Sequence, residues 1–337
     1  MAKPLPRAED LISYDQAVAG HDGVMSDADH ILFIKPCTPA EAGFYETTIA
    51  EHPDFAELMP TFIGRLELAE DQAATLEEQG AALIAQRSLP EPYVPTKNRK
   101  IPTNLAVVLE NAAHGFKRPN VLDVKLGVRL WADDAHPDKK TRFDKVTQET
   151  THKNLGFRIA GMRVWQGNNA EPNGVIDKDG YKIYDKDYGK LVTDDNVSHA
   201  FHDFFFSKSA GMDAELSKLM MEAFLTDLEL VQQTLENQES RMYSASLLFV
   251  FEGDGDALRT AMEEASRSLR YVNGDGANHR DDSDDDSDIE DDGPKIYTLK
   301  VIDFAHAFWV PGEGPDENSL LGVRSVIRIL KDLRQDA

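Results

Sequence analysis

The stretch that decides the fold is Pro119–Gly127, which reads PNVLDVKLG. Apolar and charged residues alternate from Val121 to Val128, and this alternation predicts a strand. Side chains two positions apart on a strand point to the same face, so Asp123 and Lys125 project together. An acid and a base on one face either form a plain salt bridge or face a site that holds a nucleotide and a phosphate.

A second charged residue ends an apolar strand, in the segment Ile302–His306, which reads IDFAH. An aspartate at a strand exit is either a turn former or a ligand presented to magnesium. Asp303 is therefore a candidate metal ligand.

A third sequence feature is a lysine at the end of a predicted strand, followed closely by a glutamate at the start of a predicted helix. The apolar strand within residues 20–35 ends at Lys35, and a helix is predicted over Pro39–Ala50, with Thr38 as its N-cap and Glu41 in its first turn. Such a lysine and glutamate can form the ion pair that steadies a lysine on ATP phosphates.

The other elements follow no regular order, which favours an α+β fold over a repeated βαβ array. Residues 173–193 have the spacing of a hairpin. Helices are predicted over residues 133–150, 214–240 and 320–333, and buried strands over residues 105–109, 157–165, 246–252 and 296–304.

Composition excludes several classes of protein. The 337 residues include 60 acidic and 36 basic ones, for a net charge of -24, which opposes generic binding to nucleic acid or to an acidic membrane. The single cysteine, Cys37, excludes a disulfide framework and a cysteine-based zinc site. No apolar run approaches the roughly 18 residues of a membrane span, and the first residues lack a signal-peptide core. We expect a soluble intracellular protein without a transmembrane segment.

The charge is unevenly distributed. Residues 281–292 read DDSDDDSDIEDD, within a stretch from 273 to 293 rich in Gly, Asn, Asp and Ser. Such a run repels itself and buries no core, so we expect a disordered acidic loop. Residues 115–163, in contrast, carry more bases than acids. That window is either a solvated helix surface or a pocket for a small, highly charged anion.

Two common nucleotide-binding signatures are missing. The sequence has no G-x-x-x-x-G-K-[ST] and no H-R-D-x-x-x-x-N. These absences argue against a P-loop protein and an ordinary protein kinase.

Taken together and in this order, the pieces resemble the inositol polyphosphate kinase family. The family hallmark P-x-x-x-D-x-K-x-G is matched by Pro119, Asp123, Lys125 and Gly127. Its S-L-L-F strand is matched by residues 246–249 and its I-D-F-A-H by residues 302–306, while residues 155–159 and 41–45 also follow the family pattern. The resemblance extends over about residues 18–335.

The resemblance implies a two-lobed, protein-kinase-like α+β fold. The N-terminal lobe would comprise residues 1–112 and the C-terminal lobe residues 113–337. Within the C-terminal lobe, residues 130–156 would form a helical inositol-phosphate-binding insertion and residues 273–293 the disordered acidic loop.

The resemblance also implies roles for single residues. Lys35, steadied by Glu41, would contact the α- and β-phosphates of ATP, and Asp303 would bind Mg²⁺. Asp123 would act as a base or hold the ribose hydroxyls, and the ribose contact is favoured. Lys125 would meet the inositol phosphates and the transferred phosphoryl group, so that Asp123, Lys125 and Asp303 form the catalytic set. Adenine would meet the backbone of Glu110, Asn111 and Ala112. The expected substrate contacts are Lys125, Lys139, Lys140, Arg142, Lys145 and His306.

The compact chain and the LGFRIAGMRVW segment at residues 155–165 favour the multikinase branch of the family. That branch uses ATP to convert inositol tris- and tetrakisphosphates to the pentakisphosphate. The alternatives are a hexakisphosphate kinase that makes pyrophosphates, and a scaffold whose acidic loop binds basic regulatory or transcription proteins. The resemblance further implies a monomer in the nucleus and cytoplasm that does not bind nucleic acid directly.

Overall fold

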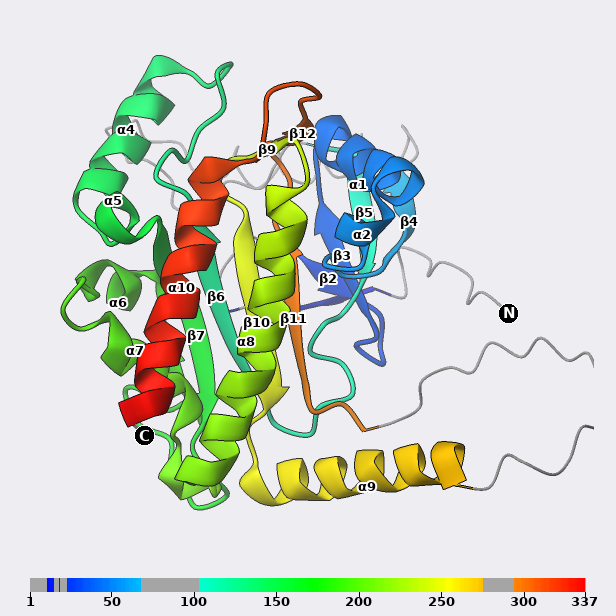
Figure 1. Cartoon of the computed structure of the whole chain (residues 1–337), viewed down its shortest axis with the longest axis vertical. Helices are drawn as coiled ribbons and strands as arrows, with labels where there is room; N and C mark the ends of the chain where they lie inside the picture. The colour runs from blue at the N-terminus through cyan, green and yellow to red at the C-terminus, as the bar shows by residue number, and fades with distance from the viewer. Residues whose placement is uncertain (1–10, 15–17, 19–22, 68–102, 275–293, 337) are drawn as a thin grey trace, which may run out of the picture.

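The computed structural model describes residues 11–14, 18, 23–67, 103–274 and 294–336. Within them, two antiparallel five-stranded sheets stand side by side, and most helices lie against the second sheet (Figure 1). The first sheet has the strand order β1-β2-β3-β5-β4. Its strands are β1 (Ile12–Ser13), β2 (Met25–Ser26), β3 (Leu32–Pro36), β4 (Phe62–Glu67) and β5 (Leu105–Glu110).

The first sheet is accompanied by α1 (Pro39–Glu51) and α2 (Pro53–Ala56). Helix α1 begins where predicted, because the Thr38 side chain accepts a hydrogen bond from the Glu41 N–H and Pro39 occupies the first turn. Glu41, six residues after Lys35, therefore lies in the first turn of α1, at the end of the helix nearest to β3.

The second sheet has the order β11-β10-β6-β7-β8, with β6 at its centre. In the register of this sheet, Asp123 of β6 pairs with Leu248 of β10 on one side and with Gly161 of β7 on the other. A small two-stranded sheet joins β9 (Ser240–Met242) to β12 (Ala307–Trp309). The five strands are β6 (Pro119–Leu126), β7 (Phe157–Trp165), β8 (Tyr181–Tyr184), β10 (Ser246–Glu252) and β11 (Tyr297–Ile302).

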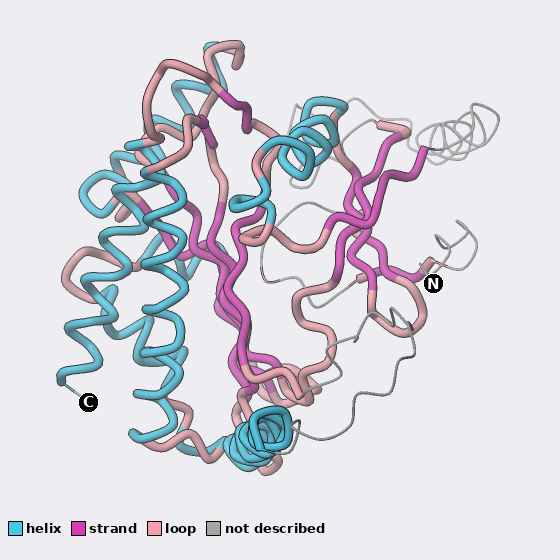
Figure 2. The backbone as a smooth tube through the Cα atoms, turned by 45° about the vertical axis from the view of Figure 1, so that its right-hand side comes forward, coloured by secondary structure: helices cyan, strands magenta, loops and turns pink. Residues whose placement is uncertain are grey.

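Two long helices, α8 and α10, lie across one face of the second sheet (Figure 1). The tube view in Figure 2 shows α8 and α10 on one side of this sheet and the first sheet on the other. The C-terminal helices are α4 (Pro137–Gln148), α5 (His152–Leu155), α6 (Lys186–Leu191), α7 (Val197–Phe205), α8 (Ala214–Glu236), α9 (Gly255–Gly274) and α10 (Glu317–Asp336).

One apolar core continues from the first sheet into the second. Phe304, the residue that follows Asp303, is fully buried where the two parts of this core meet. The Phe304 ring lies 4.9 Å from Phe44, 5.3 Å from Tyr45 and 5.9 Å from Phe55, measured between ring centroids. Aromatic packing therefore sets the position of Asp303 relative to α1.

The structure confirms the predicted strands at residues 105–109, 157–165 and 246–252 and the long helix that begins at Ala214. The hairpin predicted over residues 173–193 is confirmed in its first half, where Ile176 pairs antiparallel with Lys182 of β8, whereas α6 follows β8 in its second half. The helix predicted from residue 133 begins only at Pro137, capped by the His136 side chain.

The connection between β10 and β11 also differs from the expectation. The two strands pair directly, as predicted, but α9 follows β10 and extends to Gly274. Residues 273 and 274 of the predicted acidic loop therefore belong to α9. The rest of that loop, residues 275–293, lies outside the described residues. Among the helices of the described part, none is long and apolar enough to cross a membrane.

Alanine substitutions at two helical glycines should change the free energy of unfolding in opposite directions. A Cβ atom added at Gly322 of α10 would lie 2.4 Å from the Gly156 carbonyl oxygen, whereas one added at Gly43 of α1 would meet nothing within 4 Å. Gly322→Ala should lower the free energy of unfolding by about 1–3 kcal/mol through overpacking. Gly43→Ala should raise it by about 0.5–1 kcal/mol through helix propensity. Urea denaturation measures both, and equal effects would contradict this helix–sheet packing.

Candidate active site

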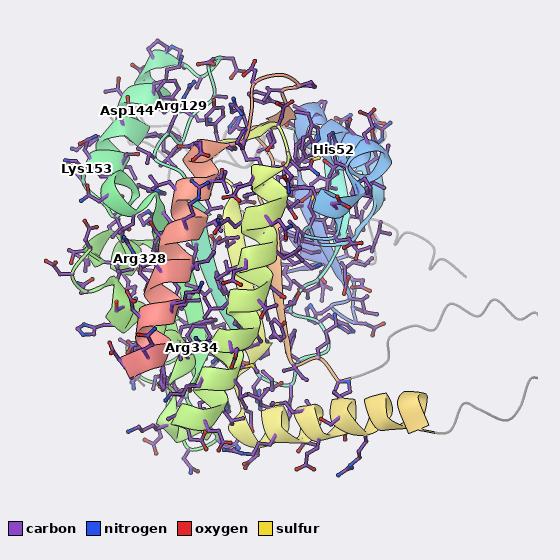
Figure 3. The ribbon with its side chains drawn as sticks, viewed as in Figure 1. His52, Arg129, Asp144, Lys153, Arg328 and Arg334 are labelled. Carbon is purple, nitrogen blue, oxygen red and sulfur yellow. The ribbon has the colours of Figure 1, made fainter. Side chains whose placement is uncertain are left out.

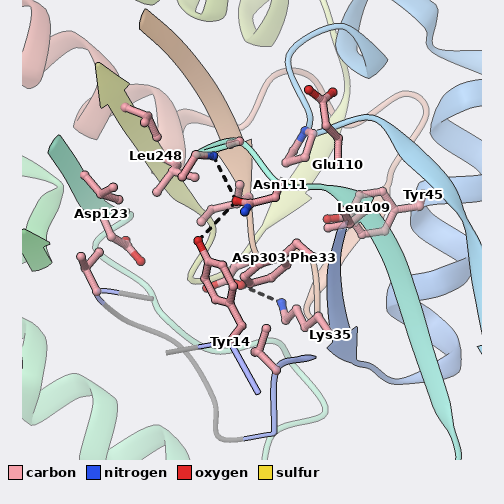
Figure 4. Close-up of a pocket in the computed structure, with 18 residues that line it drawn as sticks. Tyr14, Phe33, Lys35, Tyr45, Leu109, Glu110, Asn111, Asp123, Leu248 and Asp303 are labelled. Carbon is pink, nitrogen blue, oxygen red and sulfur yellow. Dashed lines mark hydrogen bonds and ion pairs between the residues drawn. The ribbon is translucent and has the colours of Figure 1, made fainter. Parts of the chain in front are cut away.

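The site is organised around a buried ammonium group. Lys35 on β3 donates a hydrogen bond to Asp303 at 2.7 Å (Figure 4) and another to Glu41 at 2.8 Å. Lys35 is 7% exposed and Glu41 is fully buried. Burial lowers the pKa of Lys35, but the charges of Asp303 and Glu41 outweigh burial and hold this pKa above its ordinary value. Lys35 therefore stays charged, and the pair predicted from the sequence is formed.

Asp303 faces two cations from a strained backbone position. Its φ angle is 68°, in the left-handed region that non-glycine residues rarely adopt. One carboxylate oxygen accepts from Lys35, and the other lies 3.8 Å from the Lys125 ammonium. Such strain is held by the surrounding contacts and is common at functional sites. The carboxylate is thus fixed between the two sheets.

Asp123 supplies a buried acceptor without a partner. It is 3% exposed, and its Oδ1 atom makes no hydrogen bond to any described residue. Burial raises the pKa of Asp123 to about 6, although Lys125 opposes the shift. A group that donates a hydrogen bond to this oxygen, such as a sugar hydroxyl, would remove the cost of leaving it unsatisfied.

A cavity of about 820 Å³ lies between the sheets, with Lys35, Asp123 and Asp303 among its lining residues (Figure 4). Most of its other walls are apolar and come from both sheets, as suits a flat aromatic base. The apolar walls include Val24, Phe33, Leu109, Val121, Leu248, Val250 and Ile302.

The segment that joins the sheets closes one side of this cavity. The Glu110 carboxylate accepts hydrogen bonds from the Lys295 ammonium at 2.9 Å and from the Thr61 hydroxyl at 2.8 Å. The Asn111 side chain donates to the His30 carbonyl oxygen and accepts from Tyr14 and Ala113. Ala112 also lines the cavity, and its N–H makes no hydrogen bond to a described residue. The backbone of Ala112 is therefore available to a base.

The segment after Gly127 brings α4 to this site. The Lys139 ammonium on α4 lies 2.9 Å from Nε2 of His306, which brings α4 to the chain just after Asp303. Burial and the nearby Arg142 lower the pKa of Lys139. Lys139 thus lies beside His306, three residues after Asp303, and the Asp303 carboxylate in turn lies 3.8 Å from Lys125.

The other predicted substrate contacts lie further out on α4. Lys140 donates to the Asp133 carbonyl oxygen at 2.7 Å. Arg142 is exposed and lies over the Phe143 ring, and the exposed Lys145 pairs with Glu149 at 3.7 Å. Their roles in substrate binding stay predictions.

Two residues near this site were not foreseen from the sequence. Arg129 lies over the Trp131 ring at 4.1 Å and the Tyr243 ring at 4.7 Å (Figure 3). Asn318 of α10 accepts hydrogen bonds from the N–H groups of Val128 and Arg129, each at 2.8 Å. The only local signal was Gly127, whose φ of 98° and contact with Asn318 leave no room for a side chain.

No three His, Cys, Asp or Glu residues gather into a metal site in the part of the chain described here. A divalent cation at Asp303 would therefore need further oxygen ligands from a bound phosphate. This donor set fits Mg²⁺, which is usually held by one or two carboxylates together with substrate phosphates.

The fold and site define a class: a two-lobed kinase with a mostly apolar cavity between its sheets. The sequence model of the family described as "Inositol polyphosphate kinase" matches residues 106–331. Inositol polyphosphate multikinases of Saccharomyces cerevisiae and Schizosaccharomyces pombe are 33% and 30% identical, over 94% and 92% of this chain and 96% and 92% of their own length. The chain belongs to the inositol polyphosphate kinase family.

A solved structure agrees with this assignment. The crystal structure of the inositol phosphate multikinase of S. cerevisiae in complex with ADP and Mn²⁺ is 28% identical in sequence, with a TM-score of 0.59. The match covers 90% of this chain and 98% of that one. The expected fold class is confirmed.

Removal of the central ammonium should affect both stability and nucleotide use. Lys35→Met leaves Glu41 buried without its partner, which should cost about 3–5 kcal/mol of unfolding free energy. In Lys35→Met/Glu41→Leu the apolar pair should restore most of this stability. Both variants should lose about 10²-fold or more in kcat/KM for ATP. Denaturation curves and steady-state kinetics measure these effects, and normal ATP kinetics in the folded double variant would remove Lys35 from the site.

Proposed function

We propose that this protein is an ATP-dependent inositol polyphosphate multikinase. It transfers the γ-phosphoryl group of ATP to hydroxyls of inositol tris- and tetrakisphosphates and yields the pentakisphosphate. The observation that carries the proposal is the position of Lys35 and Asp303 at one cavity, with Lys125 beside Asp303 and with His306, which pairs with Lys139, three residues further along the chain.

The nucleotide would lie between the two sheets. Its base contacts the apolar walls and the free N–H of Ala112, and a ribose hydroxyl donates to Asp123. Lys35 contacts the α- and β-phosphates. Asp303 would hold a divalent cation, which neutralises phosphate charge when bound. The ADP and Mn²⁺ in the S. cerevisiae structure support nucleotide and cation binding, and we propose Mg²⁺ as the ion in this chain.

The acceptor would lie against Lys125, Lys139 and His306. Its hydroxyl oxygen bonds to the γ-phosphorus while the bond to ADP breaks, and the hydroxyl proton is released. Positioning and charge neutralisation supply most of the rate in such reactions. Lys140, Arg142 and Lys145 would add positive charge around the acceptor.

Location and partners extend the proposal. We propose that the protein acts in the nucleus and also in the cytoplasm, as the family resemblance implies. The acidic segment at residues 281–292 would attract basic regulatory proteins by its charge.

A direct assay tests the function. With ATP and Mg²⁺, purified protein should phosphorylate inositol trisphosphate to the pentakisphosphate and use hexakisphosphate far more slowly. Hexakisphosphate kinases are also similar, at 28% identity over 72% of this chain, so hexakisphosphate is the informative competitor. Preferred turnover of hexakisphosphate, with pyrophosphate products, would contradict the multikinase proposal.

Loss of Lys139 should weaken acceptor binding selectively. A charge-assisted contact to phosphate is lost in Lys139→Ala, so the KM for inositol trisphosphate should rise by about 10- to 100-fold. The KM for ATP should stay unchanged. The control is Lys153→Ala, which removes an exposed lysine on α5 (Figure 3) and should leave both constants unchanged. Equal kinetics for the two variants would show that Lys139 does not contact the acceptor.

A further inference from the structure

A second polar hollow lies outside the nucleotide cavity, against the segment that joins the two sheets. Its volume is about 820 Å³, and Asn111 and Ala113 line both spaces. We call it the hinge hollow. Its basic lining residues are His30, His114, Lys117, Arg118 and Arg163.

The backbone beneath this hollow is held rigidly. The buried Glu252 carboxylate accepts hydrogen bonds from the N–H groups of Lys117 at 2.6 Å and Arg118 at 3.0 Å. The Arg118 carbonyl oxygen accepts from the N–H of Gly253 at 2.8 Å. The backbone positions of Lys117 and Arg118 are thus fixed by Glu252 and Gly253.

The side chains of these two residues remain unneutralised. Within the described residues, neither Lys117 nor Arg118 has a carboxylate within 4.0 Å, and their side chains make no hydrogen bond. The Arg118 guanidinium lies over the Trp165 ring, 4.5 Å from its centroid. Arg163 differs, because Asp177 and Asp179 lie 3.4 and 3.9 Å from it.

We propose that the hinge hollow binds a phosphate-bearing anion. Within the described residues, two cations without a carboxylate partner and two imidazoles outnumber Asp179, the acidic residue of the lining, and suit the charge and the hydrogen-bond acceptors of a phosphate group. Their placement is notable in a chain of net charge -24, where most surfaces repel such a ligand.

The position of the hollow couples this anion to the nucleotide. His30 belongs to the turn between β2 and β3, whereas Lys117 and Arg118 immediately precede β6 of the other lobe. Asn111 donates to the His30 carbonyl oxygen at 2.8 Å and also lines the nucleotide cavity. An anion that contacts His30 and Arg118 joins the two lobes at their connection, so it changes nucleotide affinity, and the nucleotide changes its affinity reciprocally. Binding of the anion itself does not depend on the proposed kinase activity.

Calorimetry with inorganic tripolyphosphate tests the site, with the nucleotide site saturated by a non-hydrolysable ATP analogue. The parent should bind the probe in a saturable manner. Lys117→Gln/Arg118→Gln should weaken this binding by about 10- to 100-fold. The matched control Lys208→Gln/Arg328→Gln removes the same charges from exposed positions and should bind as the parent does. Sedimentation with vesicles of phosphatidylcholine containing phosphatidic acid provides a second arm.

Each outcome decides the proposal. Probe or vesicle binding that is lost in Lys117→Gln/Arg118→Gln and kept in the control supports the site and identifies its ligand as a soluble phosphate or a lipid headgroup. If the parent protein binds neither tripolyphosphate nor the vesicles, the proposal is overturned, whether or not the variant folds. Equal binding by the two double variants, each with an unchanged melting temperature, overturns it as well.

Discussion

The rest of the site depends on the two hydrogen bonds that the Lys35 ammonium donates, one to Glu41 and one to Asp303. Glu41 comes from α1 and Asp303 from the end of β11, so this one cation joins the two lobes. A buried charge is costly unless it is paired and hydrogen-bonded. The pairing therefore requires the capped start of α1 and the strained turn at Asp303 to form together.

The aromatic core beside this cation makes that geometry possible. Phe304 packs among rings of α1 and α2 directly after the left-handed Asp303. Because the carboxylate cannot move far without moving Phe304, the distance between Lys35 and Asp303 is set by packing. On the other side, Asn318 fixes the chain after Gly127, which continues to α4.

Local patterns predicted the parts of the structure that depend on local physics. Strand alternation placed Asp123 and Lys125 on one face, and the N-cap signal at Thr38 placed Glu41 near Lys35. The contact between Lys35 and Asp303 joins residues far apart in sequence, and no sequence pattern predicted it; the family resemblance implied only that both residues serve one ATP site. Helix α9 was missed because its polar residues run into the acidic segment, and the turn-rich stretch at 173–193 concealed α6. No local pattern marks Asn318, whose role comes from tertiary packing.

The most direct test of this account is a crystal structure of the protein with a non-hydrolysable ATP analogue and Mg²⁺. The account predicts that Lys35 keeps its bond to Glu41 and contacts the α- and β-phosphates, while the Asp303 carboxylate coordinates the metal. A ribose hydroxyl should lie within hydrogen-bond distance of Asp123. A nucleotide bound between the sheets with its metal and phosphates remote from Asp303 and Lys35 would contradict the central claim.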